Sequence, residues 1–134
     1  MKNGTRAFHY TLLLILISML SSSANNTFAQ DYKPYVRIAK IMIDSAQLDN
    51  YKAALKEHAE AAVSKEPGVL TLYAVYDKDH PTSVTVFEIY ASVPAYQSHI
   101  QTPHFLKYKS TVKDMVKSLV LTDVIPIILE TKPR

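Results

Sequence analysis

Histidine and buried carboxylate are the side chains of this sequence best suited to proton transfer near neutral pH. His99 follows Tyr96 by three residues, so the two share one face of an expected short helix. Glu88 lies within the apolar run SVTVFEIY, where an unpaired carboxylate would be costly to bury. A carboxylate bound to an imidazole orients the ring and raises its basicity. We therefore predict a His99–Glu88 pair, which fits a general base and a structural hydrogen bond equally well.

Three further histidines have distinct expected settings. His104 follows Pro103 in the first turn of an expected helix, where the positive helix end favours a neutral ring. That ring could exchange a proton with a ligand, or it could lie partly exposed. His58 falls on the apolar face of another expected helix, a position more typical of a core residue than of a ligand. His80 lies in a polar turn and is expected to face solvent.

No metal or cofactor motif accompanies these residues. Glu88 with His58, His99 and His104 would make a plausible ligand set for a transition metal. However, His99 and His104 lack the i, i+4 spacing of two ligands on one helix, and a proline separates them. We therefore predict no metal site. A chain with no cysteine and only two glycines also excludes thiolate chemistry and glycine-rich phosphate loops, so no cofactor is expected.

Nine tyrosines against four phenylalanines give the chain many aromatic hydroxyls. Buried tyrosine hydroxyls need hydrogen-bond partners, and a cavity that they line suits a small aromatic ligand bearing oxygens. The alternative is that tyrosine simply fills the core and an interface. The residues expected around such a cavity, besides the catalytic candidates, are Tyr51, His58, Tyr73, Tyr96, Phe105 and Tyr108.

Hydrophobic periodicity places these residues on strands and helices. Strands are expected at 35–43, 69–76, 83–90 and 121–130. Helices are expected at 47–66, at 94–101 and from Thr102 to Leu119. The order β-α-β-β-α-β, with one extra short helix, is that of the ferredoxin-like α+β fold.

The expected sheet has apolar side chains on both faces. In the third strand Val84 and Val86 point to one face, and Phe87 and Ile89 to the other. The ferredoxin-like arrangement covers only one face with helices, so the bare face must be buried elsewhere. Two such sheets packed face to face would form a homodimer.

Residues 1–29 have the features of a secretory signal peptide. A basic start precedes the apolar run TLLLILISML, and Thr27-Phe28-Ala29 places small residues at the −3 and −1 positions. Such a run is shorter than the roughly 20 residues that cross a membrane, although a retained anchor is the alternative. These features predict an exported protein, periplasmic or secreted. The remaining domain, 30–134, has nearly balanced charge, which predicts no nucleic-acid or membrane partner.

Several short motifs together resemble the antibiotic biosynthesis monooxygenase domain. They are Lys56-Glu57-His58-Ala59, Glu66-Pro67-Gly68, Phe87-Glu88-Ile89-Tyr90, Ala95-Tyr96-Gln97-Ser98-His99 and Thr102-Pro103-His104-Phe105. The resemblance covers about Val36 to Leu119 and implies a dimeric α+β barrel. It also implies one of three activities: cofactor-independent oxygenation of quinols or polyphenols, haem degradation, or isomerisation of small sugar-derived phosphates. The haem-degrading branch uses a tryptophan, and this chain has none.

The leading functional expectation is therefore a monooxygenase that oxidises a quinol or polyphenol with O2. In this mechanism His99, held by Glu88, removes a phenolic proton, and His104 with Tyr96 or Tyr73 stabilises the developing oxyanion. An isomerase of a small carbonyl compound would use the same base without oxygen. A non-catalytic dimer that binds a small aromatic ligand is the third possibility.

Overall fold

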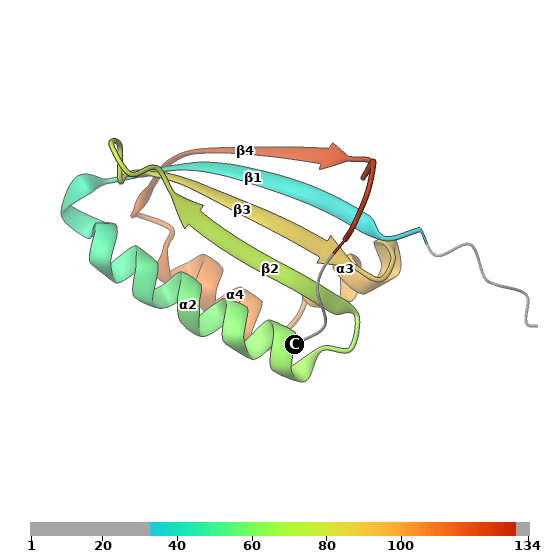
Figure 1. Ribbon diagram of the computed structural model, residues 1–134. Coiled ribbons are helices and arrows are strands. Elements are labelled where there is room, and N and C mark those ends of the chain that lie inside the picture. The colour runs from blue at the N-terminus through green and yellow to red at the C-terminus, as the bar shows by residue number, and fades with distance from the viewer. Residues whose placement is uncertain (1–32, 131–134) are drawn as a thin grey trace, which may run out of the picture. The chain divides into compact units, whose positions relative to one another are not determined.

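The computed structural model describes residues 33–130, and the predicted signal peptide lies outside this range. A four-stranded sheet carries its helices on one face (Figure 1). The strands are β1 (Tyr35–Ile43), β2 (Val69–Tyr76), β3 (Ser83–Tyr90) and β4 (Val116–Val124). The helical segments are η2 (Ser45–Gln47), α2 (Leu48–Lys65), α3 (Val93–His99) and α4 (Pro103–Thr111).

The strand order is β2-β3-β1-β4, and every neighbouring pair is antiparallel. This order places β3 between the two strands joined by α2, which is the split β-α-β arrangement of the ferredoxin-like fold. The predicted α+β fold is confirmed. The register sets Arg37 of β1 opposite Glu88 on one side and opposite Asp123 on the other, which gathers three charged residues at one end of the sheet.

Helix α2 packs on the sheet through a single apolar stripe. Tyr51, Leu55, His58 and Ala62 are its buried residues, and their spacing follows the helical period as predicted. The chain then turns tightly at Gly68. A Cβ on Gly68 would lie 2.7 Å from the Cβ of Ala95, so the glycine allows α3 to approach the turn closely.

The C-terminal third departs from the sequence-based expectation. Helix α4 ends at Thr111 instead of continuing to Leu119, and the last strand is Val116–Val124 instead of 121–130. Apolar spacing along this stretch is compatible with both a helix and a strand. Pairing with β1 sets Leu119 opposite Ile41. This pairing favours the strand because it satisfies backbone hydrogen bonds along the open edge of β1.

The face of the sheet that carries no helix among residues 33–130 is apolar, as predicted. Met42, Tyr73, Val75 and Val120 lie on it and expose between 41% and 65% of their surface. Their neighbours along each strand point to the helices instead, because side chains alternate across a sheet. Within the described residues, no helix is both long and apolar enough to cross a membrane.

Candidate active site

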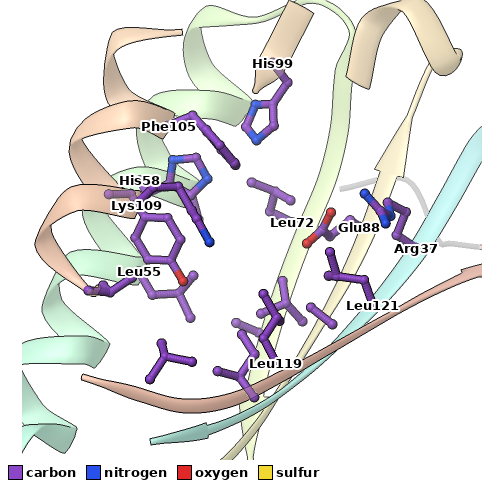
Figure 2. A pocket seen from close by; sticks show the side chains of 18 of the residues that line it. Arg37, Leu55, His58, Leu72, Glu88, His99, Phe105, Lys109, Leu119 and Leu121 are labelled. Atoms are coloured by element: carbon purple, nitrogen blue, oxygen red, sulfur yellow. The ribbon is translucent and has the colours of Figure 1, made fainter. Parts of the chain in front are cut away.

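A cavity of about 310 Å³ lies between the sheet and the helices (Figure 2). Its wall is largely aliphatic, with side chains such as Leu55, Leu72 and Val86. Pockets of this kind commonly bind small molecules through a few placed polar groups. The polar and aromatic residues along the wall are Arg37, His58, Glu88, Tyr90, Tyr96, His99, Phe105, Tyr108, Lys109 and Lys113.

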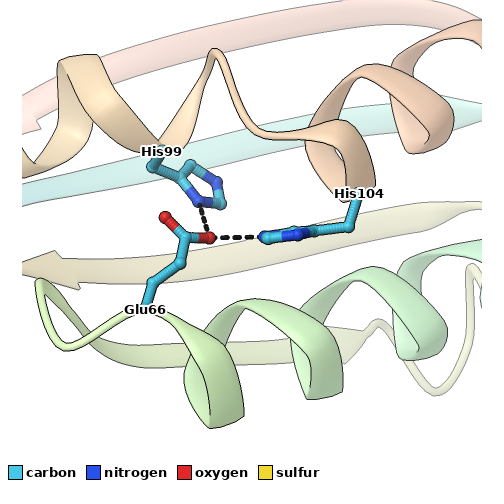
Figure 3. A group of neighbouring side chains, drawn as sticks. All are labelled: Glu66, His99 and His104. Carbon is cyan, nitrogen blue, oxygen red and sulfur yellow. Dashed lines mark hydrogen bonds and ion pairs between the residues drawn. The ribbon is translucent and has the colours of Figure 1, made fainter.

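His99 reaches this cavity from the last turn of α3 and is held from behind by a carboxylate. Its Nδ1 lies 2.8 Å from Oε1 of Glu66, the residue that follows α2 (Figure 3). The His99 side chain is 1% exposed and that of Glu66 is 13% exposed. Burial shields this contact from water and therefore strengthens it.

His104 binds the same carboxylate oxygen from the other side. Its Nε2 contacts Oε1 of Glu66 (Figure 3). The hydroxyl of Thr102 lies 3.1 Å from the same ring nitrogen. An ionised carboxylate only accepts hydrogen bonds, so both histidines donate to it. His99 then carries its proton on Nδ1, and its Nε2 is left with a free lone pair, as a base requires.

The carboxylate that orients His99 is thus Glu66, and the predicted His99–Glu88 pair is wrong. Glu88 accepts a hydrogen bond of 2.9 Å from the hydroxyl of Tyr90 and lines the cavity from β3. Burial raises the pKa of Glu88, while Tyr90, Arg37 and His99 oppose that rise. This carboxyl group therefore binds a proton more readily than an exposed glutamate.

Arg37 is fixed beside Glu88 by three neighbours. Its Nε lies 2.9 Å from Oδ1 of Asp123, an ion pair by distance but without the alignment of a good hydrogen bond. Its guanidinium stacks over the ring of Tyr96 at 4.7 Å and over that of Tyr35 at 5.7 Å. Stacking and the ion pair hold the cation rigidly against the cavity wall.

His58 contributes a neutral ring to the wall. It stacks on Tyr108 with ring centroids 4.7 Å apart, and the hydroxyl of Tyr108 in turn lies 2.9 Å from that of Tyr51. Burial, followed by the nearby His99 and His104, lowers the pKa of His58 to about 4. Its Nδ1 is buried and has no hydrogen-bond partner among residues 33–130, which favours the neutral ring.

The structure brings together most of the predicted site residues around the cavity: His58, Glu88, Tyr96, His99, Phe105 and Tyr108. His104 lies behind His99, beside a second and smaller cavity, and Tyr51 lies behind Tyr108. Tyr73 does not line the cavity, because it lies on the opposite face of the sheet and is 65% exposed.

Glu66 and Lys109 are site residues that the sequence reasoning missed. In the sequence, Glu66 is the last residue of an expected helix and part of the Glu66-Pro67-Gly68 motif, with no role in the site assigned to it. An acidic side chain at the negative end of a helix is unfavourable, and this was the available hint that another group compensates it. Lys109 falls within the helix expected from Thr102 to Leu119 and is not among the predicted site residues, but it extends toward the cavity (Figure 2).

Glu66, His99 and His104 are also the described residues that could hold a metal ion, since one ligand atom from each lies within 4.8 Å of the others. They overlap only partly with the set considered from the sequence, which had Glu88 and His58 in place of Glu66. In each ring, the nitrogen nearest to the carboxylate already has Oε1 of Glu66 as its hydrogen-bond partner. A cation would have to displace the proton that each ring donates.

Comparison with known proteins gives a consistent result. Residues 34–111 match the family model described as antibiotic biosynthesis monooxygenase. A crystal structure of a candidate antibiotic biosynthesis monooxygenase from Bacteroides thetaiotaomicron is 49% identical. The match covers 76% of this chain and 97% of that one, with a TM-score of 0.73. No curated protein matches the chain.

Two more distant structures share the fold. A candidate monooxygenase from Lactobacillus acidophilus is 26% identical with a TM-score of 0.69, and the match covers 70% of this chain and 45% of that one. A candidate antibiotic biosynthesis monooxygenase from Nitrosomonas europaea is 22% identical with a TM-score of 0.67, covering 71% of this chain and 91% of that one.

Proposed function

The chain belongs to the antibiotic biosynthesis monooxygenase family, and on this basis we propose that it oxygenates a small quinol-type aromatic with O2. Family membership supports a monooxygenase-type function. The substrate class is inferred from the cavity, whose wall is apolar except for a few groups able to bind phenolic oxygens. The observation that carries the proposal is the position of His99: its Nδ1 is bound to Glu66, and its ring lies at the cavity wall.

The first step is removal of a phenolic proton by Nε2 of His99. Glu66 stabilises the imidazolium that forms and keeps the ring oriented, as an orienting carboxylate does for other histidine bases. The phenolate is far more electron-rich than the phenol, so it can pass one electron to O2. The base therefore starts the reaction without an external reductant.

The remaining steps balance within the substrate and O2. The phenoxyl radical and superoxide combine at a ring carbon, which forms a C–O bond and gives a peroxide. The peroxide takes a proton from the imidazolium of His99, and its O–O bond breaks as the ring carbon loses its hydrogen. One oxygen atom stays on the ring as a quinone carbonyl, and the other leaves as water. The quinol itself thus supplies all the electrons.

Other cavity residues hold the substrate in this scheme. The guanidinium of Arg37 lies beside Glu88 and would donate hydrogen bonds to a substrate oxygen on that wall. The imidazole of His58, stacked on Tyr108, forms part of the wall beside the substrate. Tyr96 and Phe105 enclose the ring, and the aliphatic wall keeps water away from the radical pair.

We also propose that two copies pack through their bare sheet faces. Met42, Tyr73, Val75 and Val120 would be buried there, which accounts for the apolar character of a face that no helix covers in residues 33–130. Export directed by residues 1–29 completes the proposal and would place the reaction outside the cytoplasm.

The test is oxygen uptake by the metal-stripped protein with a panel of hydroquinones and polyphenols. We expect substrate-dependent uptake above the autoxidation blank, abolished in His99→Gln and retained in His80→Gln, whose exposed side chain is the matched control. Uptake that is equal in both variants would exclude His99 as the base. Turnover of a carbonyl compound without oxygen would point to an isomerase, and binding without any chemical change to a ligand carrier.

A further inference from the structure

Two lysines at the cavity wall have no ionic partner among residues 33–130. Lys109, in the last turn of α4, and Lys113, just beyond it, both line the cavity, and Lys109 extends toward it (Figure 2). Two other lysines of this segment are paired: Lys107 with Glu57, and Lys117 with Asp44 at 3.3 Å. The positive charge that faces the cavity from this side is therefore uncompensated.

The opposite wall carries one acidic residue, Glu88, which lies beside Arg37 in the strand register. The same wall as the lysines also carries the apolar side chains of Phe105, Val112 and Val116. A ligand that matches this arrangement has an apolar ring and one anionic group.

We propose that the ligand of this cavity is an aromatic acid whose carboxylate lies between the ammonium groups of Lys109 and Lys113. The identity of the reacting ring rests on the proposed function, whereas recognition of the carboxylate does not. The volume of about 310 Å³ suits one or two fused rings with small substituents. The carboxylate stays near solvent at the lysines, and the ring extends inward toward His99.

A simpler role for Lys109 would be to stabilise the negative end of α4. That role does not involve Lys113, which lies beyond the last helical residue, Thr111, and still lines the cavity. The two roles make different predictions. Helix stabilisation affects the free energy of unfolding, whereas carboxylate recognition affects the ratio of affinities for charged and neutral ligands.

The experiment compares 2-naphthoate with its neutral isostere 2-naphthamide in calorimetric titrations of the purified protein at low ionic strength. Neither probe is a quinol, so binding is measured without turnover. We expect 2-naphthoate to bind about five- to tenfold more tightly, since charge pairs near solvent are individually weak. The double variant Lys109→Gln/Lys113→Gln should lose most of this preference. Lys107→Gln/Lys117→Gln, which removes the same charge elsewhere on the segment, should keep it.

Equal affinities for the two probes, no binding of either, or a preference that survives in Lys109→Gln/Lys113→Gln would overturn the proposal. Oxygen uptake with neutral hydroquinones, measured in parallel, reports separately on the proposed function. A naphthoate preference that depends on the two lysines supports the carboxylate site even if no hydroquinone is oxidised.

Discussion

Glu66 and His99, thirty-three residues apart in the chain, form a hydrogen bond of 2.8 Å between the carboxylate Oε1 and the ring Nδ1. The carboxylate follows the end of α2, and the ring ends α3. The close approach of Ala95 to Gly68 brings these two helix ends together. A tight packing contact thus positions the proposed catalytic base.

Replacement of Glu66 by Gln should destabilise the protein and impair the base. The amide accepts hydrogen bonds without a negative charge, so two buried ring donors lose a charged acceptor. We expect the free energy of unfolding to fall by about 1.5–3 kcal/mol, the range for hydrogen bonds to charged groups. Urea denaturation measures this loss. Glu60→Gln, at an exposed position of α2, is the control and should change stability by less than about 0.5 kcal/mol.

Replacement of His99 by Gln should lower kcat for quinol oxidation by about 10²- to 10⁴-fold, the usual contribution of a general base. The residual rate should rise with pH, because a substrate already deprotonated in solution no longer needs the base. Steady-state oxygen uptake between pH 6 and 9, with the autoxidation blank subtracted, measures both effects. If His99→Gln keeps the pH profile of the wild-type protein, His99 is not the general base.

His58 should make stability depend on pH. Its pKa is lowered to about 4 in the folded protein by burial and by the neighbouring histidines, whereas the unfolded chain has an ordinary histidine pKa near 6.5. Between these values the unfolded state binds the extra proton, so stability is full above pH 6.5 and is lost as the pH falls toward 4. The loss should be on the order of 2–3 kcal/mol. Denaturation experiments over the same pH range measure this effect. The free energy of unfolding of His58→Gln should fall by less than that of the wild-type protein.

Gly68→Ala should destabilise the fold by about 1–3 kcal/mol, as overpacking in a tight contact does. The added Cβ would lie 2.7 Å from that of Ala95, and Gly68 does not have a positive φ. The cost is therefore steric, and the double variant Gly68→Ala/Ala95→Gly should recover part of it. Thermal unfolding of the single and double variants tests this, and the absence of any recovery would contradict the steric explanation.

Val75→Lys should convert the proposed dimer to a monomer. Val75 is 46% exposed on the bare sheet face, where a lysine would place an unpaired charge in the interface. Val63→Lys, at a 47% exposed position of α2, makes the same change away from that face and should leave the dimer intact. Sedimentation velocity distinguishes the species. A monomeric unaltered protein would disprove the proposed assembly.

The sequence by itself determined the first three strands, their order and the buried stripe of α2. Strands β1, β2 and β3 have the predicted bounds, because β-branched runs flanked by turn residues leave little ambiguity. The stripe of α2 follows from helical periodicity alone. The sequence also named six of the ten polar and aromatic residues around the cavity, since side chains on inward faces must meet where those faces meet.

Only the tertiary structure decided which carboxylate binds His99, where α4 ends and which way Tyr73 and Lys109 point. Glu66 and Glu88 are both acidic residues near the same helix in space, and spacing along the chain cannot choose between them. With β4 paired to β1, α4 is shorter than the periodicity predicts, and Lys109 lies in its last turn. Such choices depend on contacts between segments distant in sequence, whereas local patterns report only the preferences of each segment.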